Sequence, residues 1–120
     1  MTLCLDTYAL MELHDRNPSF IQLLDEEWVV TDLTLTEFYN VLQRKHGEKT
    51  ADYWCAKFSH DTAQVPLPLL LKAMKFKITN AKQNLSFFDC VGYVYAREHK
   101  MKFVTGDKEF KGKEGVLFIK

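Results

Sequence analysis

The sequence has no excess of either charge and no long apolar run. Sixteen Lys and Arg residues balance sixteen Asp and Glu residues, so the chain lacks the overall basic field that attracts nucleic acid. No apolar stretch approaches the roughly 20 residues that cross a bilayer, and Asp6 interrupts the apolar start. We therefore expect neither a membrane segment nor a signal peptide. Without repeats or low-complexity stretches, residues 1–120 are expected to form a single domain around one core.

Cysteine is scarce, and its spacing matches no common zinc or disulfide framework. Cys4, Cys55 and Cys90 are odd in number and form no CxxC pair, which predicts reduced thiols and a cytoplasmic location. Cys4 and Cys90 lie next to acidic residues discussed below, but we expect both to serve as apolar filling.

Short apolar runs alternate with amphipathic segments along the whole chain. The apolar runs predict strands at 3–5, 28–31, 102–105 and 116–119. Helices are predicted at 7–15, 18–24, 34–46, 48–59, 69–79 and 86–99. Residues 65–68 are interpreted as a connector. Strands that alternate with helices favour right-handed crossovers and parallel pairing. We therefore predict an α/β fold, a three-layer α/β/α sandwich with a mainly parallel sheet of four or five strands.

Four acidic residues lie where an apolar run gives way to a helix start or a turn: Asp6, Glu37, Asp89 and Asp107. In an open α/β sheet such positions fall at the carboxyl ends of strands, in the crevice where ligands bind. Two carboxylates ~4 Å apart repel by about 4 kcal/mol at an effective dielectric of roughly 20. A divalent cation would neutralise the group, and oxygen-only ligands favour Mg²⁺ or Mn²⁺ over zinc. The pattern predicts a metal-dependent hydrolase of phosphodiesters.

Each of these acids also has a purely structural interpretation. Thr34–Glu37 and Ser86–Asp89 match the capping box, and Asp6 precedes a helix, where the dipole favours negative charge. Thr105–Asp107 is consistent with an ordinary turn in which the acid bonds its own backbone. A cap or dipole interaction stabilises the fold by only ~1 kcal/mol. Repulsion between clustered carboxylates destabilises it by more than that, and this comparison favours a metal site. The two roles are compatible, because one oxygen can accept a backbone N–H while the other binds an ion.

The motifs around these acids resemble those of the PIN-domain family, most closely the small VapC-type toxins of prokaryotic toxin–antitoxin pairs. They are Leu5-Asp6-Thr7-Tyr8-Ala9-Leu10, Leu35-Thr36-Glu37-Phe38, residues 85–93 and residues 104–110. The resemblance covers essentially the whole chain in order and length. Where many members place Asn two positions after the first Asp, this chain has Tyr8.

The resemblance implies a Mg²⁺- or Mn²⁺-dependent endoribonuclease. Asp6, Asp89 and Asp107 would hold one ion, with Glu37 shared or placed to accept a second. Thr105 would be the site hydroxyl that positions a water or a phosphate oxygen. The alternative is a PIN-like module that binds RNA or protein with weak or no nuclease activity. A histidine-based mechanism is not expected, since the sequence supplies no matching acid or nucleophile for the four histidines: His14, His46, His60 and His99.

The densest basic cluster surrounds Phe76 and consists of Lys72, Lys75, Lys77 and Lys82. It is a candidate track for RNA phosphates, because backbone contacts supply most non-specific affinity. A solvated helix face is an equally open interpretation of the same lysines.

The resemblance implies two protein partners in addition to the RNA substrate. One is a small cognate antitoxin, and the apolar residues of the first two predicted helices are candidates either for its groove or for the core: Leu10, Leu13, Phe20, Leu23 and Leu24. The other is a second copy of the chain. A homodimer is suggested by aromatic residues in excess of what one small core needs: Phe38, Tyr39, Tyr53, Trp54 and Phe58.

Overall fold

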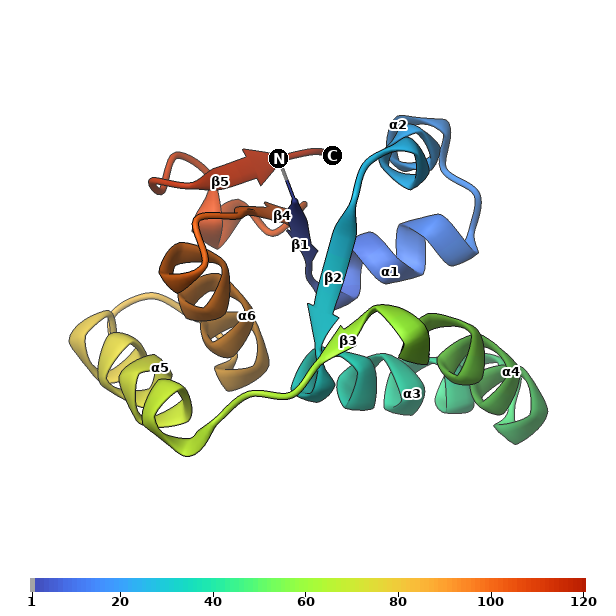
Figure 1. The fold of residues 1–120 in the computed structure, drawn as a ribbon, viewed down its shortest axis with the longest axis horizontal. Helices are drawn as coiled ribbons and strands as arrows, with labels where there is room; N and C mark the ends of the chain where they lie inside the picture. The colour runs from blue at the N-terminus through green and yellow to red at the C-terminus, as the bar shows by residue number, and fades with distance from the viewer. Residues whose placement is uncertain (1) are drawn as a thin grey trace.

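The computed structural model describes residues 2–120 and contains a five-stranded sheet with helices on both faces (Figure 1). The strands are β1 (Leu3–Leu5), β2 (Trp28–Thr31), β3 (Thr62–Ala63), β4 (Lys102–Thr105) and β5 (Val116–Phe118). The α-helices are α1 (Thr7–His14), α2 (Pro18–Ile21), α3 (Asp32–His46), α4 (Glu48–Phe58), α5 (Leu67–Thr79) and α6 (Phe87–Glu98). Short 3₁₀ helices are η1 (Gln22–Asp25), η2 (Ser59–Asp61) and η3 (Lys108–Phe110). The predicted α/β class and parallel sheet are confirmed.

All neighbouring strands in the sheet are parallel, in the order β3-β2-β1-β4-β5. The chain first adds β2 and β3 on one side of β1, and then crosses to place β4 and β5 on the other side. The strand order therefore reverses between β1 and β4, where Leu5 pairs with Val104. Such a switch point leaves a crevice beyond the carboxyl ends of the two strands, and ligands of open α/β sheets bind there.

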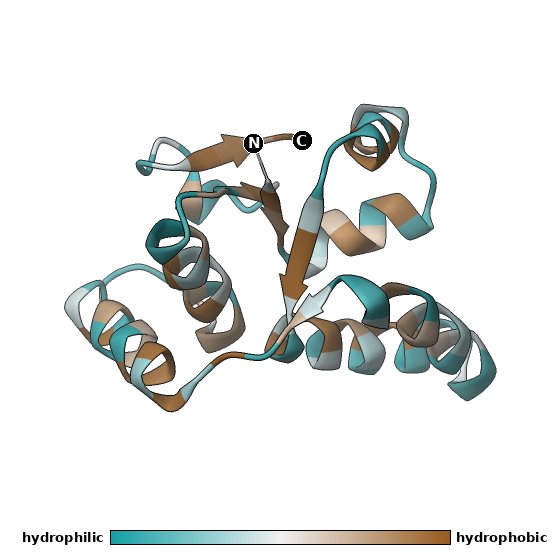
Figure 2. Ribbon diagram, viewed as in Figure 1, coloured by the Kyte–Doolittle hydropathy of each residue, from teal (hydrophilic) through white to brown (hydrophobic). Residues whose placement is uncertain are grey.

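Two apolar cores cover the two faces of the sheet, because successive strand residues point to opposite sides. Leu5 and Val104 belong to the core formed with α1, α3 and α4. Cys4 and Phe103 belong to the core formed with α5 and α6. Figure 1 shows α5 and α6 on one side of the sheet and α1 to α4 on the other, and Figure 2 shows the apolar colouring of the strands between them. This is the predicted three-layer arrangement.

Some predicted boundaries were wrong for identifiable reasons. The helix predicted from residue 34 begins at Asp32, because Thr31 is its N-cap and the Thr31 Oγ1 accepts from the Thr34 N–H at 3.0 Å. The helix predicted from residue 69 begins at Leu67, since Pro68 is tolerated in a first turn.

Two further elements differ from the sequence-based prediction. The short strand β3 was missed, and it pairs with β2 through Thr62 and Ala63. The helix predicted at 18–24 is divided into α2 and η1. The three cysteines are free thiols, and Cys4 and Cys90 are buried, as expected for apolar filling. Across residues 2–120, no helix combines the length and apolar character that crossing a membrane requires.

The surfaces predicted for partner binding are mostly core. Of the proposed groove residues only Leu24 is exposed, at 51%, and the others are buried: Leu10, Leu13, Phe20 and Leu23. Phe38 and Phe58 of the proposed dimer face are buried too, whereas Tyr53 is exposed. For all the groove candidates but Leu24, the core alternative therefore holds, and the predicted dimer face includes two residues that the core already uses. An exposed apolar row instead follows α5, through Leu67, Leu71, Met74 and Ile78.

Candidate functional site

A cavity of about 480 Å³ opens beyond the carboxyl ends of β1 and β4, and all four predicted acids line it. Asp6 comes from the junction of β1 and α1, and Asp107 from the loop after β4. Glu37 is on α3 and Asp89 on the first turn of α6. The lining is completed by Thr7, Tyr8, Val41, Gly106, Lys108 and Lys120. Four separate elements thus bring carboxylates to one opening at the switch point of the sheet.

Asp6 is the most deeply placed of these acids, with 1% of its surface exposed. It is the N-cap of α1, and its Oδ1 accepts from the Ala9 N–H at 2.7 Å. The neighbouring Thr105 side chain acts to lower the pKa of its carboxylate. Burial, and then the charge of Asp89, nevertheless raise the pKa of Asp6 well above its ordinary value. The carboxylate is therefore held in place while its negative charge is poorly compensated.

The negative charge of Asp89, at the start of α6, is also poorly compensated. Its N–H donates to the Ser86 Oγ at 3.1 Å, so Ser86 caps the helix. Burial, and after it the charges of Glu37 and Asp107, raise the pKa of Asp89 to about 7. The Ser86 hydroxyl opposes this shift only in part. Burial and repulsion thus both disfavour the ionised form of these acids, and a bound cation would offset both effects.

Thr105 lies behind the cavity wall, next to Asp6 and Asp107. Its side chain is fully buried, and it does not line the cavity. Its Oγ1 accepts from the Asp107 N–H at 3.0 Å, and its side chain acts to lower the pKa of Asp6. The Asp107 Oδ1 in turn accepts from the Glu109 N–H at 3.0 Å. Thr105 therefore holds the Asp107 turn and favours the ionised form of Asp6, and it does not face the cavity, where the resemblance implied contact with a water or phosphate.

The structure contains some of the predicted caps and turns but not all of them. The Asp6 and Ser86 caps and the Asp107 turn are all present. The Thr34–Glu37 capping box is wrong, because Thr34 lies inside α3 and is buried. Glu37 consequently has no capping role, and its Oε1 accepts a hydrogen bond from the Thr7 hydroxyl across the cavity.

Lysines at the cavity are not the ones that the sequence pattern indicated. Lys108 and Lys120 line it, and neither belongs to the predicted cluster around Phe76. The predicted track of Lys72, Lys75, Lys77 and Lys82 lies on α5 and the turn after it, outside the lining. Within the track, Lys72 pairs with Glu98 at 2.5 Å.

The donor set of the cavity fits a hard divalent cation. All its candidate ligands are carboxylate oxygens, which suit Mg²⁺ or Mn²⁺ better than zinc. Among residues 2–120, no three of these carboxylates bring oxygen atoms within 4.8 Å of one another. Mg²⁺ commonly retains several waters and uses only one or two carboxylates, so this wider spacing is compatible with it.

Comparisons with known proteins agree with this architecture. A family model described as PIN domain matches residues 3–115. No curated protein matches the chain. Among solved structures, the sarcin–ricin-loop-cleaving toxin VapC20 of Mycobacterium tuberculosis superposes with a TM-score of 0.81 at 17% identity, covering 95% of this chain and 96% of that one.

Two toxin–antitoxin structures are also similar. A toxin–antitoxin complex from Klebsiella pneumoniae has a TM-score of 0.74 at 18% identity, over 96% of this chain and 95% of that one. VapBC2 from Rickettsia felis, bound to a promoter DNA fragment, has a TM-score of 0.74 at 11% identity, over 99% of this chain and 98% of that one. At these identities the likeness establishes the fold.

Proposed function

Because the chain belongs to the PIN-domain family, we propose that it is a Mg²⁺- or Mn²⁺-dependent endoribonuclease, with residues 1–120 forming one PIN domain. The observation that carries the proposal is the meeting of Asp6, Glu37, Asp89 and Asp107 around one cavity at the switch point of the sheet. Helix caps alone would not require four carboxylates there, since burial and then mutual repulsion leave Asp6 and Asp89 with raised pKa values.

Each residue around the cavity has a distinct proposed role. A bound Mg²⁺ or Mn²⁺ would supply the positive charge that neutralises a phosphodiester and activates water for its hydrolysis. Asp6, Asp89 and Asp107 are the proposed ligands, and Glu37, held by Thr7, is placed to share an ion or to accept a proton. Thr105 is proposed to keep Asp107 in position through its Oγ1 and to favour the ionised form of Asp6.

Local basic residues would attract the substrate, because the chain has no net charge. Lys108 and Lys120 at the cavity are proposed to contact the phosphates next to the scissile bond. The lysines of the predicted track are proposed to contact phosphates further along the RNA: Lys72, Lys75, Lys77 and Lys82. A Lys75→Ala and Lys82→Ala double variant should then bind long RNA less tightly. Its affinity should depend on salt with a slope smaller by roughly 0.7 per lost contact, and a short oligonucleotide should bind as before.

We further propose that the enzyme is the toxin of a toxin–antitoxin pair. VapC20 is described as a toxin, and the Klebsiella and Rickettsia structures are complexes with antitoxins. An amphipathic antitoxin helix would fit the hollow of about 250 Å³ beside the exposed Ile21 and Leu24, which Arg16 and Lys57 flank. Expression of the chain alone should arrest growth of its host, and expression of Asp107→Asn should not.

A homodimer is also part of the proposal, with the apolar row on α5 as its surface. Leu67, Leu71, Met74 and Ile78 are spaced four, three and four residues apart, which places them on one side of the helix. Exposed apolar rows of this kind are typical of interfaces, and a two-fold pair could bury the same row from both copies. In sedimentation experiments Leu71→Asp should give a monomer, whereas Tyr53→Asp on the originally predicted face should not.

The activity itself is tested by incubating the purified chain with structured RNA and with single-stranded DNA. We expect RNA cleavage with Mg²⁺ or Mn²⁺, no cleavage with EDTA, and little cleavage of DNA. RNA binding without cleavage in any of these ions would favour the alternative, a PIN-like binding module.

A further inference from the structure

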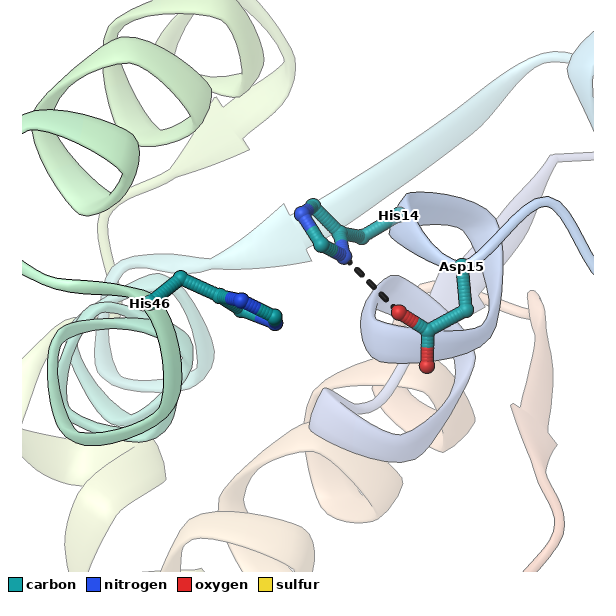
Figure 3. A group of neighbouring side chains, drawn as sticks. All are labelled: His14, Asp15 and His46. Carbon is teal, nitrogen blue, oxygen red and sulfur yellow. Dashed lines mark hydrogen bonds and ion pairs between the residues drawn. The ribbon is translucent and has the colours of Figure 1, made fainter.

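Three potential metal ligands meet at a second place in the fold, outside the lining of the acidic cavity: His14, Asp15 and His46 (Figure 3). His14 is the last residue of α1, Asp15 follows it, and His46 is the last residue of α3. One nitrogen or oxygen atom from each residue lies within 4.8 Å of those of the other two. Figure 3 shows the two imidazole rings reaching from α1 and α3 into the space between these helices.

The His14 ring is held in place by several contacts. Its Nδ1 lies 2.9 Å from the Asp15 Oδ1, and its side chain is only 14% exposed. The ring packs edge-on against Trp54 at 5.2 Å and lies 5.0 Å from the His46 ring. Asp15 already lies against His14, and since Asp15 and His46 are both exposed, rotations of their side chains can adjust the spacing of the three groups. Zinc bonds of ~2.0–2.2 Å place tetrahedral ligand atoms roughly 3.4 Å apart, a separation that such rotations can reach.

The surroundings also favour a cation. Both α1 and α3 end here, and the C-terminal end of a helix carries partial negative charge. Arg16, Arg44 and Lys45 are neighbours in sequence, but all three are exposed, so solvent screens their repulsion.

We propose that His14, Asp15 and His46 bind a borderline transition-metal ion of the Zn²⁺ type, with water completing the coordination. Two imidazoles and one carboxylate are a donor set that suits zinc, in contrast to the oxygen-only cavity. The ion joins the C-terminal end of α1 to that of α3. Asp6 caps the other end of α1, and α3 carries Glu37, so both helices that this ion joins also form walls of the cavity. Binding to the folded chain alone stabilises it.

Trp54 provides a direct reporter of binding, because its ring contacts that of His14. In the full-length Trp28→Phe variant, Trp54 is the remaining tryptophan. Co²⁺ bound at the three residues should quench its fluorescence at a stoichiometry of one ion per chain, and Zn²⁺ should displace Co²⁺ and restore the signal. His46→Ala should weaken Co²⁺ binding at least tenfold, and Asp15→Asn should also weaken it. Zn²⁺ should raise the melting temperature of the parent and leave that of His46→Ala unchanged.

Two control variants separate this site from other ion binding. His60→Ala removes an exposed histidine outside the group, and Asp107→Asn removes a carboxylate of the cavity. Both should retain the quenching and the zinc-induced rise in melting temperature. Quenching that survives both His46→Ala and Asp15→Asn, or that disappears in Asp107→Asn, would overturn the proposal. His46→Ala and Asp15→Asn change exposed side chains, so circular dichroism should show both variants folded like the parent.

Discussion

The ring of Tyr8 lies so close to the backbone of Gly106 that no side chain fits between them. A Cβ atom at position 106 would lie 2.2 Å from the Tyr8 Cε1. Gly106 is not among the glycines with positive φ, so this contact, and not an unusual backbone conformation, is what requires glycine. Both residues line the acidic cavity, and Gly106 separates Thr105 from Asp107. The aromatic residue at position 8 and the glycine at position 106 thus depend on each other.

Gly106→Ala should therefore lower the free energy of unfolding by about 1–3 kcal/mol, because the new methyl group must displace the Tyr8 ring. In a Tyr8→Ala background the same substitution should cost much less, since the space is then open. Urea unfolding of the four proteins in this double-mutant cycle measures the difference. An equal cost in both backgrounds would show that the contact with Tyr8 is not the reason for glycine.

The stability of the metal-free protein should depend on pH through Asp89. The pKa of this carboxyl is raised from 3.8 to about 7 on folding, so between these values only the folded state retains the proton. Its contribution to stability is complete below pH 3.8 and is lost as pH rises through about 7. In EDTA, we expect a higher melting temperature at about pH 5 than at about pH 8.

Asp89→Asn should flatten this dependence, and part of it should persist because the pKa of Asp6 is raised as well. Excess Mg²⁺ should raise the melting temperature of the wild type mainly at the higher pH, where the carboxylates are ionised. A wild-type melting temperature that increases from the lower to the higher pH in EDTA would contradict the raised pKa of Asp89.

Two substitutions at Asp6 distinguish its role as the N-cap of α1 from the effect of its buried negative charge. Asn is as good an N-cap as Asp, so Asp6→Asn should keep the bond to the Ala9 N–H while removing a buried charge. It should be at least as stable as the wild type without metal, whereas Asp6→Ala should lose ~1 kcal/mol with the cap. Both variants should lose metal-dependent cleavage. Thermal unfolding in EDTA distinguishes the two variants. Equal destabilisation of Asp6→Asn and Asp6→Ala would argue that removing the charge of Asp6 relieves no unfavourable interaction in the folded protein.

The acidic positions could be predicted because they depend on local rules. Asp6 follows a short apolar strand, and the spacing of Ser86 and Asp89 is typical of a helix start. Each of these patterns is contained in a few neighbouring residues. The parallel sheet then brings such positions to one edge. The start of α3 was misplaced because Thr31 and Thr34 are both capable caps, and only the structure shows which one accepts the backbone N–H.

Other features depend on contacts between distant segments. Two residues, Thr62 and Ala63, form β3 only because β2 offers a partner, and so short a segment has no periodicity of its own. Lys120 reaches the cavity because β5 pairs with β4. His14 and His46 are far apart in the sequence, and they meet because α1 and α3 end at the same place. No short sequence pattern contains this information.

The most direct test of the central claim is RNA cleavage by Asp107→Asn in Mn²⁺, measured beside its melting temperature. Asn is nearly isosteric with Asp and can keep the turn to the Glu109 N–H, so the variant should fold like the wild type. Glu109→Gln is the matched control, because it changes the next acidic side chain, which does not line the cavity. We predict that Asp107→Asn loses cleavage while Glu109→Gln retains it, with little change in melting temperature for either. Full cleavage by Asp107→Asn would contradict a metal-dependent site at these carboxylates.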